Sequence, residues 1–134
     1  LIPLGGADLI VSLEPMEALR YLPYLKPNGW IVTNATPFVN IPNYPETEAL
    51  TAALAEHKHV VTFDMDAVAK EVASPRSSNM VLLGAAAPFI EIPAEKIEQG
   101  IRDVFAAKGD AIVEANLKAF GAGLKFTTDL LNSK

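Results

Sequence analysis

The 134-residue sequence contains no cysteine, so the chain can form neither a disulfide nor a thiolate nucleophile. Zinc ribbons and iron–sulfur clusters held by its own thiolates are excluded for the same reason. Charge is also scarce: charged residues make up 20% of the chain, and 16 acidic against 11 basic side chains give a net charge of −5. No cluster of lysine and arginine provides the cationic surface that nucleic acids and anionic membranes bind. We therefore expect neither as a partner.

Long apolar runs are lacking as well. The apolar, uncharged stretch 77–90 is 14 residues long, whereas a membrane-spanning helix needs about 20, and the longer uncharged stretch 27–45 is interrupted by prolines. No basic region followed by an apolar run opens the chain as a signal peptide would. Hydrophobic residues still make up 50% of the sequence, which suffices for an ordinary core. The sequence predicts a globular protein without a membrane span, with the cytoplasm as its default location.

Three short apolar runs predict the strands of a parallel sheet. They cover residues 8–13, 30–33 and 59–63. Each is almost continuously apolar, which is typical of strands covered on both faces. Helices predicted at 15–22 and 46–57 connect the runs into two βαβ units, the second one through an irregular loop at 37–45. Residues 26–29, Lys-Pro-Asn-Gly, predict a turn before the second strand.

The second half of the chain predicts helices only. They cover residues 66–73, 77–87, 94–108 and 110–131. Gly109 ends the third of these helices, and Asp110 is a suitable N-cap for the fourth. Gly121 and Gly123 weaken the last helix by roughly 1 kcal/mol each relative to alanine, which indicates close packing against a neighbouring segment or a partner chain.

Together these elements predict an α/β fold with an open, mainly parallel sheet, helices on both faces in a Rossmann-like three-layer arrangement, and a helical C-terminal half. Three strands are few for about six helices, and Leu1 is not an initiator methionine. We therefore expect that upstream strands are missing from this sequence. Neither a repeat nor a long linker divides the chain, which predicts a single domain over residues 1–134.

Candidate ligand contacts follow the predicted strands, because ligands of open α/β sheets collect at the carboxyl ends of the strands. Glu14 follows the first strand, and either contacts a ligand or a facing loop or caps the helix that begins at Pro15. Asn34 and Thr36 follow the second strand. For these two, ligand or interface contact competes with hydrogen bonding inside the loop.

Two further pairs of side chains are candidate metal ligands. Asp64 and Asp66 alternate after the third strand, and His57 and His59 flank its start. Neither pair has further metal ligands nearby in the sequence, so helix capping is the favoured role for the aspartates and zinc binding is not favoured for the histidines. No metal site is predicted.

Arg76 and Asn79 stand at the start of the predicted helix 77–87, whose unpaired N–H groups favour anions. A phosphate or carboxylate would fit there, and the alternative is an N-cap with a solvated arginine. The chain contains no Ser/His/Asp order, P-loop or Gly-x-Gly-x-x-Gly motif. The sequence therefore predicts no catalytic residues and no self-sufficient active site.

Residues 7–29, which include Leu-Glu-Pro at 13–15 and Lys-Pro-Asn-Gly at 26–29, resemble the gamma-type subunits of 2-oxoacid:ferredoxin oxidoreductases, in particular those of the indolepyruvate class. Later blocks of that family are matched in the same order at 75–79, 82–85 and 116–120. The resemblance covers essentially the whole chain, although Ser77 and Ser78 stand where the family has small residues of the alanine type. The family's opening strand and Gly-rich loop have no counterpart, so contacts made there are in doubt.

The resemblance implies a subunit, inactive alone, of a complex that oxidatively decarboxylates indolepyruvate or other aryl-pyruvates to aryl-acetyl-CoA and reduces ferredoxin. Thiamine diphosphate, its Mg²⁺ and the iron–sulfur clusters would then belong to the larger, catalytic alpha-type subunit. Coenzyme A would be a co-substrate, with Arg76 and Asn79 as candidate contacts.

Two alternatives remain open at this point. Residues 25–30 are also similar to the turn before a late strand of S-adenosylmethionine methyltransferases, although those enzymes end in an antiparallel strand pair and helices are predicted here. A non-catalytic subunit that only assembles a complex is compatible with the same sequence.

Overall fold

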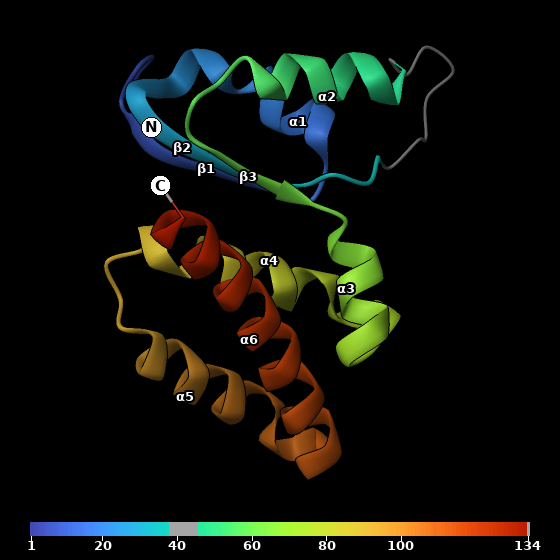
Figure 1. Cartoon of the computed structure of the whole chain (residues 1–134). Helices are drawn as coiled ribbons and strands as arrows, with labels where there is room; N and C mark the ends of the chain where they lie inside the picture. The colour runs from blue at the N-terminus through green and yellow to red at the C-terminus, as the bar shows by residue number, and fades with distance from the viewer. Residues whose placement is uncertain (38–45, 134) are drawn as a thin grey trace. The chain divides into compact units, whose positions relative to one another are not determined.

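The computed structural model describes residues 1–37 and 46–133 (Figure 1). Its contacts divide the chain into two compact units, unit 1 (Leu1–Asp64) and unit 2 (Met65–Lys134). Whether they form the single domain predicted from the sequence stays a prediction. The irregular loop predicted at 37–45 lies outside the described residues, apart from Pro37.

Unit 1 contains a three-stranded parallel sheet with the order β1-β2-β3 (Figure 1). The strands are β1 (Ala7–Ser12), β2 (Leu25–Asn34) and β3 (Val60–Phe63). Ile31 in β2 pairs with Ile10 of β1 on one side and with Val60 of β3 on the other. The three apolar runs of the sequence therefore form the parallel sheet that they predict.

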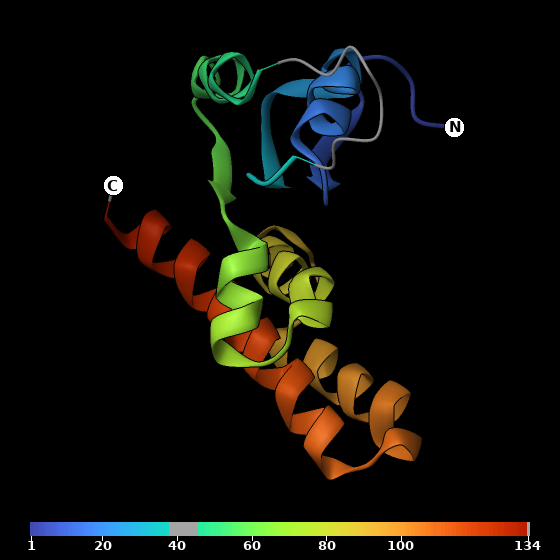
Figure 2. The same cartoon turned by 90° about the vertical axis from the view of Figure 1, so that its right-hand side faces the viewer.

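Two helices connect these strands, and they cover the same face of the sheet (Figures 1 and 2). Helix α1 (Pro15–Arg20) begins with proline at its first position, where the missing N–H group is not needed. Helix α2 (Thr47–Ala55) precedes β3. Ala18 of α1 and Leu54 of α2 pack with Ile31 in one buried cluster. This cluster is the core of unit 1.

The turn predicted at residues 26–29 is wrong, because these residues belong to β2. Two pairings fix the register, Ala7 with Leu25 and Leu9 with Trp30, so that four residues of β2 bulge opposite a single residue of β1. Residues 26–29 remain part of the strand because Leu25 before them and Trp30 after them both pair with β1. A Cβ at Gly29 would lie 3.1 Å from a carbonyl oxygen of β1, so glycine is needed for space rather than for a turn.

The described part of unit 2 is helical, as predicted for the C-terminal half. Its α-helices are α3 (Met65–Val72), α4 (Ser78–Ala86), α5 (Ala94–Phe105) and α6 (Asp110–Asn132), with short 3-10 turns η2 (Pro75–Ser77), η3 (Ala87–Phe89) and η4 (Ala106–Lys108). Gly109, with a φ of 99°, separates η4 from α6 and is itself the N-cap, so Asp110 is the first helical residue and not the cap. Across residues 1–37 and 46–133, every helix is too short or too polar to cross a membrane.

Helices α4 and α6 meet backbone to backbone. A Cβ at Gly84 would collide with the Phe120 carbonyl of α6, and one at Gly123 would collide with the Val81 carbonyl of α4. The close packing predicted for Gly123 is confirmed, and the neighbour is a helix of the same chain. Gly121 differs, because nothing lies within 4 Å of the position of its Cβ. The prediction of close packing is therefore wrong for Gly121.

Candidate functional site

Polar side chains gather at the carboxyl edge of the sheet in unit 1. The strands are parallel, so their carboxyl ends lie at the same edge, where ligands of such sheets bind. We call the polar residues at or just after the strand ends the strand-end group. It comprises Ser12 and Glu14 after β1, Asn34 and Thr36 after β2, and Asp64 after β3.

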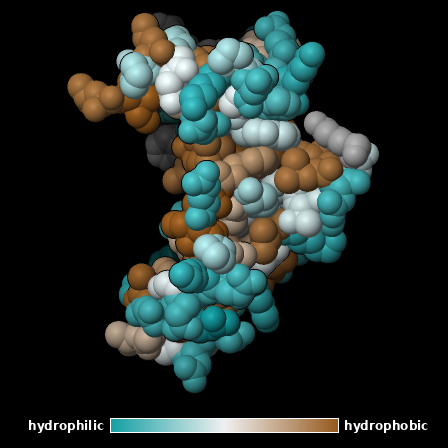
Figure 3. All heavy atoms as spheres, turned by 90° about the vertical axis from the view of Figure 1, so that its left-hand side faces the viewer, coloured by the Kyte–Doolittle hydropathy of each residue, from teal (hydrophilic) through white to brown (hydrophobic). Residues whose placement is uncertain are grey.

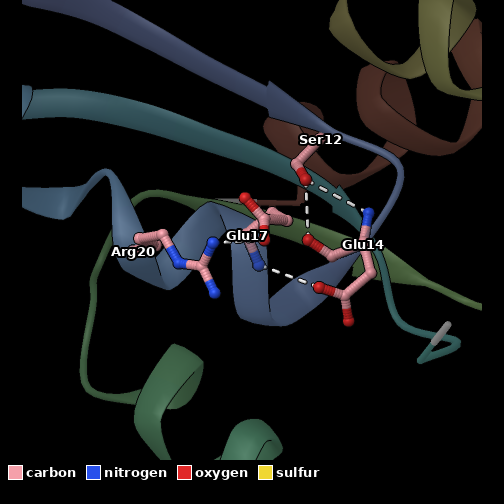
Figure 4. A network of polar contacts seen from close by, with 4 residues as sticks. All are labelled: Ser12, Glu14, Glu17 and Arg20. Carbon is pink, nitrogen blue, oxygen red and sulfur yellow. Dashed lines mark hydrogen bonds and ion pairs between the residues drawn. The ribbon is translucent and has the colours of Figure 1, made fainter. Parts of the chain in front are cut away.

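Glu14 caps helix α1 (Figure 4). Its carboxylate accepts a hydrogen bond of 2.9 Å from the backbone N–H of Glu17, whose own side chain pairs with Arg20 at 2.9 Å. The Ser12 hydroxyl donates to the Glu14 carbonyl at 2.6 Å and accepts from its N–H at 3.1 Å. The capping interpretation of Glu14 is thereby confirmed. Its contact with a ligand stays a prediction.

Asn34 and Thr36 are tied to each other and to the end of β3. The Asn34 side-chain oxygen accepts from the Thr36 N–H at 3.2 Å, and Asn34 is only 3% exposed. The Thr36 hydroxyl donates to the Asp64 carboxylate at 2.9 Å, and the Ala35 N–H donates to the Phe63 carbonyl at 2.9 Å. The loop after β2 is therefore anchored on β3, which fixes the shape of this edge.

From the sequence, Asp64 was predicted only as a helix cap or a metal ligand. Its hydrogen bond with Thr36 was not predicted. The signal lies in the strand register, because the pairing of Asn34 with Phe63 brings the residues just after β2 beside Asp64. The sequence also missed a row of hydroxyls: Ser12 pairs with Thr33, and Thr33 pairs with Thr62. The Thr62 hydroxyl oxygen is buried without a hydrogen-bond partner among the described residues.

Arg76 and Asn79 lie in unit 2, whereas the strand-end group lies in unit 1. Ser74 precedes the short turn η2 and accepts a hydrogen bond of 3.2 Å from the Arg76 backbone N–H, as an N-cap does. The side chains of Arg76 and Asn79 are exposed, and Asn79 is the second residue of α4. The structure thus places a cation and an amide near the start of this helix, as the sequence predicts.

His59 of the histidine pair has a structural role. The His59 ring stacks on the Trp30 ring with 4.6 Å between centroids and 12° between planes. Its Nδ1 lies 3.2 Å from the Asn28 carbonyl oxygen, which can only accept, so the bonded tautomer carries the proton on Nδ1. Within residues 1–37 and 46–133, no three His, Asp or Glu side chains gather as a metal site would require.

Comparison with known proteins relates nearly the whole chain to one family. Residues 1–126 match the family model described as pyruvate ferredoxin/flavodoxin oxidoreductase. Indolepyruvate oxidoreductase subunit IorB of Pyrococcus horikoshii is 34% identical, over 98% of this chain and 69% of that protein. The subunit of the same name from Thermococcus kodakarensis is 32% identical, over 98% of this chain and 68% of that protein.

A solved structure shares the fold. It is 2-oxoglutarate:ferredoxin oxidoreductase from Magnetococcus marinus, with 2-oxoglutarate, coenzyme A and succinyl-CoA bound. It matches 96% of this chain with a TM-score of 0.66, and the match spans only 21% of that chain. At 23% identity the likeness shows the fold alone.

The methyltransferase alternative is not supported by the comparisons, because residues 1–126 match the model of a different family. Both strand pairings among the described residues are parallel.

Proposed function

Because the chain belongs to the pyruvate ferredoxin/flavodoxin oxidoreductase family, we propose that it is a subunit of a complex that oxidatively decarboxylates indolepyruvate or other aryl-pyruvates. The products are carbon dioxide and the aryl-acetyl-CoA, and the electrons pass to ferredoxin. The observation that carries the proposal is the identity of 34% and 32% to two indolepyruvate oxidoreductase subunits along 98% of the chain. Assignment as a gamma-type subunit and location in the cytoplasm stay predictions.

The proposal places the metal and redox cofactors on the larger, alpha-type subunit. Iron–sulfur clusters in proteins are held mainly by cysteine thiolates, and this sequence has no cysteine. The donor set of this chain therefore does not fit an iron–sulfur cluster, and we derive no step through the clusters or through thiamine diphosphate.

Coenzyme A is the ligand for which this chain offers a suitable side chain. The exposed Arg76 guanidinium can bind a phosphate with two parallel hydrogen bonds, and Asn79 adds an amide donor near the same helix start. We place both residues at the coenzyme A site of the complex. In this role they bind and orient the co-substrate, and they take no part in bond breaking.

The subunit assignment is tested by purifying the full-length chain with an affinity tag from its own cells. We expect a larger partner that contains thiamine diphosphate and iron, together with ferredoxin reduction that requires both indolepyruvate and coenzyme A. Recovery of the chain by itself would contradict the assignment. Recovery of a complex whose activity survives removal of this chain would instead support a subunit that only assists assembly.

The role of Arg76 is tested by Arg76→Ala in the reconstituted complex. We expect the KM for coenzyme A to rise by at least about tenfold, since loss of a charged hydrogen bond to phosphate removes roughly 1.5–3 kcal/mol of binding, while the KM for the 2-oxoacid stays the same. Arg102→Ala is the matched control, because Arg102 is an exposed arginine of unit 2 in helix α5. An unchanged KM for coenzyme A in Arg76→Ala would refute this role.

A further inference from the structure

Arg76 is the one arginine without an acidic partner in the described part of the chain. Hydrophilic side chains cover much of the face shown in Figure 3, and the other two arginines each lie beside a carboxylate. Arg20 and Arg102 pair with glutamates at 2.9 and 3.9 Å. Arg76 is exposed, and the stretch 72–90 around it contains neither aspartate nor glutamate. Its positive charge is therefore available to an anion from outside the chain.

Ser77 follows Arg76 and is the N-cap residue of α4, but its hydroxyl does not cap the helix. A serine at this position normally has an extended backbone and accepts a hydrogen bond from an N–H group of the first turn. Ser74 does so at the start of η2, where its hydroxyl accepts from the Arg76 N–H. Ser77 is the last residue of η2 and has a φ of −99° and a ψ of 12°, which does not suit capping. The start of α4 is therefore left without a side-chain cap, and uncapped N–H groups at a helix start favour an anion.

The Ser77 hydroxyl also lacks any other hydrogen-bond partner among the described residues, although Ser77 is only 4% exposed. Polar groups of buried residues are nearly always hydrogen-bonded, so a hydroxyl without a partner calls for an explanation. Within residues 1–37 and 46–133, the Thr62 hydroxyl is the one fully buried side-chain oxygen that has no partner. The Ser77 oxygen is therefore not sealed inside the protein, and the small exposed part of the residue includes it. A ligand at the start of α4 can reach this oxygen.

We propose that the start of α4 is a phosphate site in which the Ser77 hydroxyl donates a hydrogen bond to the anion that the Arg76 guanidinium binds. Arginine binds phosphate with two parallel hydrogen bonds, and the positive end of the helix dipole adds to the attraction. The Ser77 hydroxyl supplies a further donor, and the phosphate supplies the partner that this hydroxyl lacks within the chain. The inference rests on the proposed function, because coenzyme A is the ligand that carries the phosphate. It adds Ser77 as a residue that binds the co-substrate.

The test measures coenzyme A binding by titration calorimetry on the reconstituted complex without 2-oxoacid, together with urea unfolding of the full-length chain. Ser77→Ala removes a hydroxyl that has no partner within the chain, so we expect an unchanged urea midpoint but a Kd for coenzyme A that rises at least about tenfold. Ser74→Ala is the comparison for stability, because it removes a hydroxyl that does cap, and its urea midpoint should fall. Ser133→Ala, at the end of α6, is the control for binding and should leave the Kd unchanged.

A second titration uses dephospho-coenzyme A, which lacks the phosphate on the ribose and keeps the diphosphate. If Ser77→Ala weakens the binding of coenzyme A alone, the hydroxyl binds the ribose phosphate. If it weakens both ligands alike, the hydroxyl binds the diphosphate, and either result supports the inference. An unchanged Kd for both ligands, or a fall in urea midpoint as large as that of Ser74→Ala, would overturn it and leave the proposed function intact. Failure of the wild-type complex to bind coenzyme A would instead refute the coenzyme A role in the proposed function.

Discussion

The two units hold their elements together in different ways. In unit 1, helices and sheet meet through side chains, with Ala18, Ile31 and Leu54 in one buried cluster. Polar side chains at the strand ends form hydrogen bonds with backbone groups of the loops. In unit 2, helices α4 and α6 meet through their backbones at Gly84 and Gly123. Side chains can shift to absorb a change in volume, whereas a carbonyl inside a helix cannot. The α4–α6 crossing in unit 2 is therefore the part of the described molecule that we expect to tolerate least change in volume.

The largest effect is expected from Gly123→Ala. The added methyl group collides with the Val81 carbonyl, and the two helices can make room for it only by moving apart and losing their close packing. We expect the free energy of unfolding to fall by about 3 kcal/mol, at the upper end of overpacking effects. Urea unfolding followed by far-UV circular dichroism measures it.

Gly121→Ala is the control in the same helix. Nothing lies near its Cβ position, and alanine favours the helix over glycine, so the free energy of unfolding should rise by about 0.5–1 kcal/mol. Equal effects of the two substitutions would show that helix propensity, and not backbone contact, governs unit 2.

A middle-sized effect is expected from Thr127→Val. The Thr127 hydroxyl is buried and donates a hydrogen bond of 2.6 Å to the Ala85 carbonyl, which joins α6 to α4 at the same crossing. Valine keeps the shape and leaves that carbonyl without its partner, so we expect a loss of about 1–3 kcal/mol in the same unfolding measurement. Thr128→Val changes an exposed neighbour and should alter stability much less. A similar loss in both variants would argue against the contact.

The smallest effect is expected in unit 1, from Glu14→Ala. The substitution removes the carboxylate that accepts from the Glu17 N–H at the start of α1, so we expect a loss of about 0.5–1 kcal/mol of stability. Glu14→Gln keeps an acceptor oxygen and should recover most of it. If the glutamine variant were as unstable as the alanine variant, charge rather than the hydrogen bond would be the cause. A loss as large as that of Gly123→Ala would contradict the contrast between the units.

Local signals in the sequence were sufficient for most of the elements. Continuous apolar runs identify all three strands because both faces of a parallel sheet are covered. Pro15 and Gly109 mark helix boundaries because each restricts or permits particular backbone angles. The segment 26–29 was predicted wrongly because its local composition favours a turn. A non-local contact, the pairing of Leu25 with Ala7, keeps it in β2.

Non-local contacts could not be predicted in the same way. The two glycines that meet at the α4–α6 crossing, Gly84 and Gly123, lie far apart in the sequence, and nothing local indicates that they share one crossing. At the strand ends, the sequence identified Asn34 and Thr36 but not the hydrogen bond from Thr36 to Asp64, because that bond depends on the register of β2 with β3. For Glu14 the sequence left two roles open, contact with a ligand or facing loop and capping of the helix. Only the hydrogen bond in the structure shows that it caps α1.

The stack of Trp30 on His59 has an optical consequence. Trp30 is the single tryptophan of the sequence and lies in unit 1, while most helical residues lie in unit 2. Indole fluorescence therefore reports only on unit 1, and in particular on whether β2 and the start of β3 stay side by side. The chain thus carries a single indole emitter that can distinguish melting of its sheet from melting of its helices without any added label.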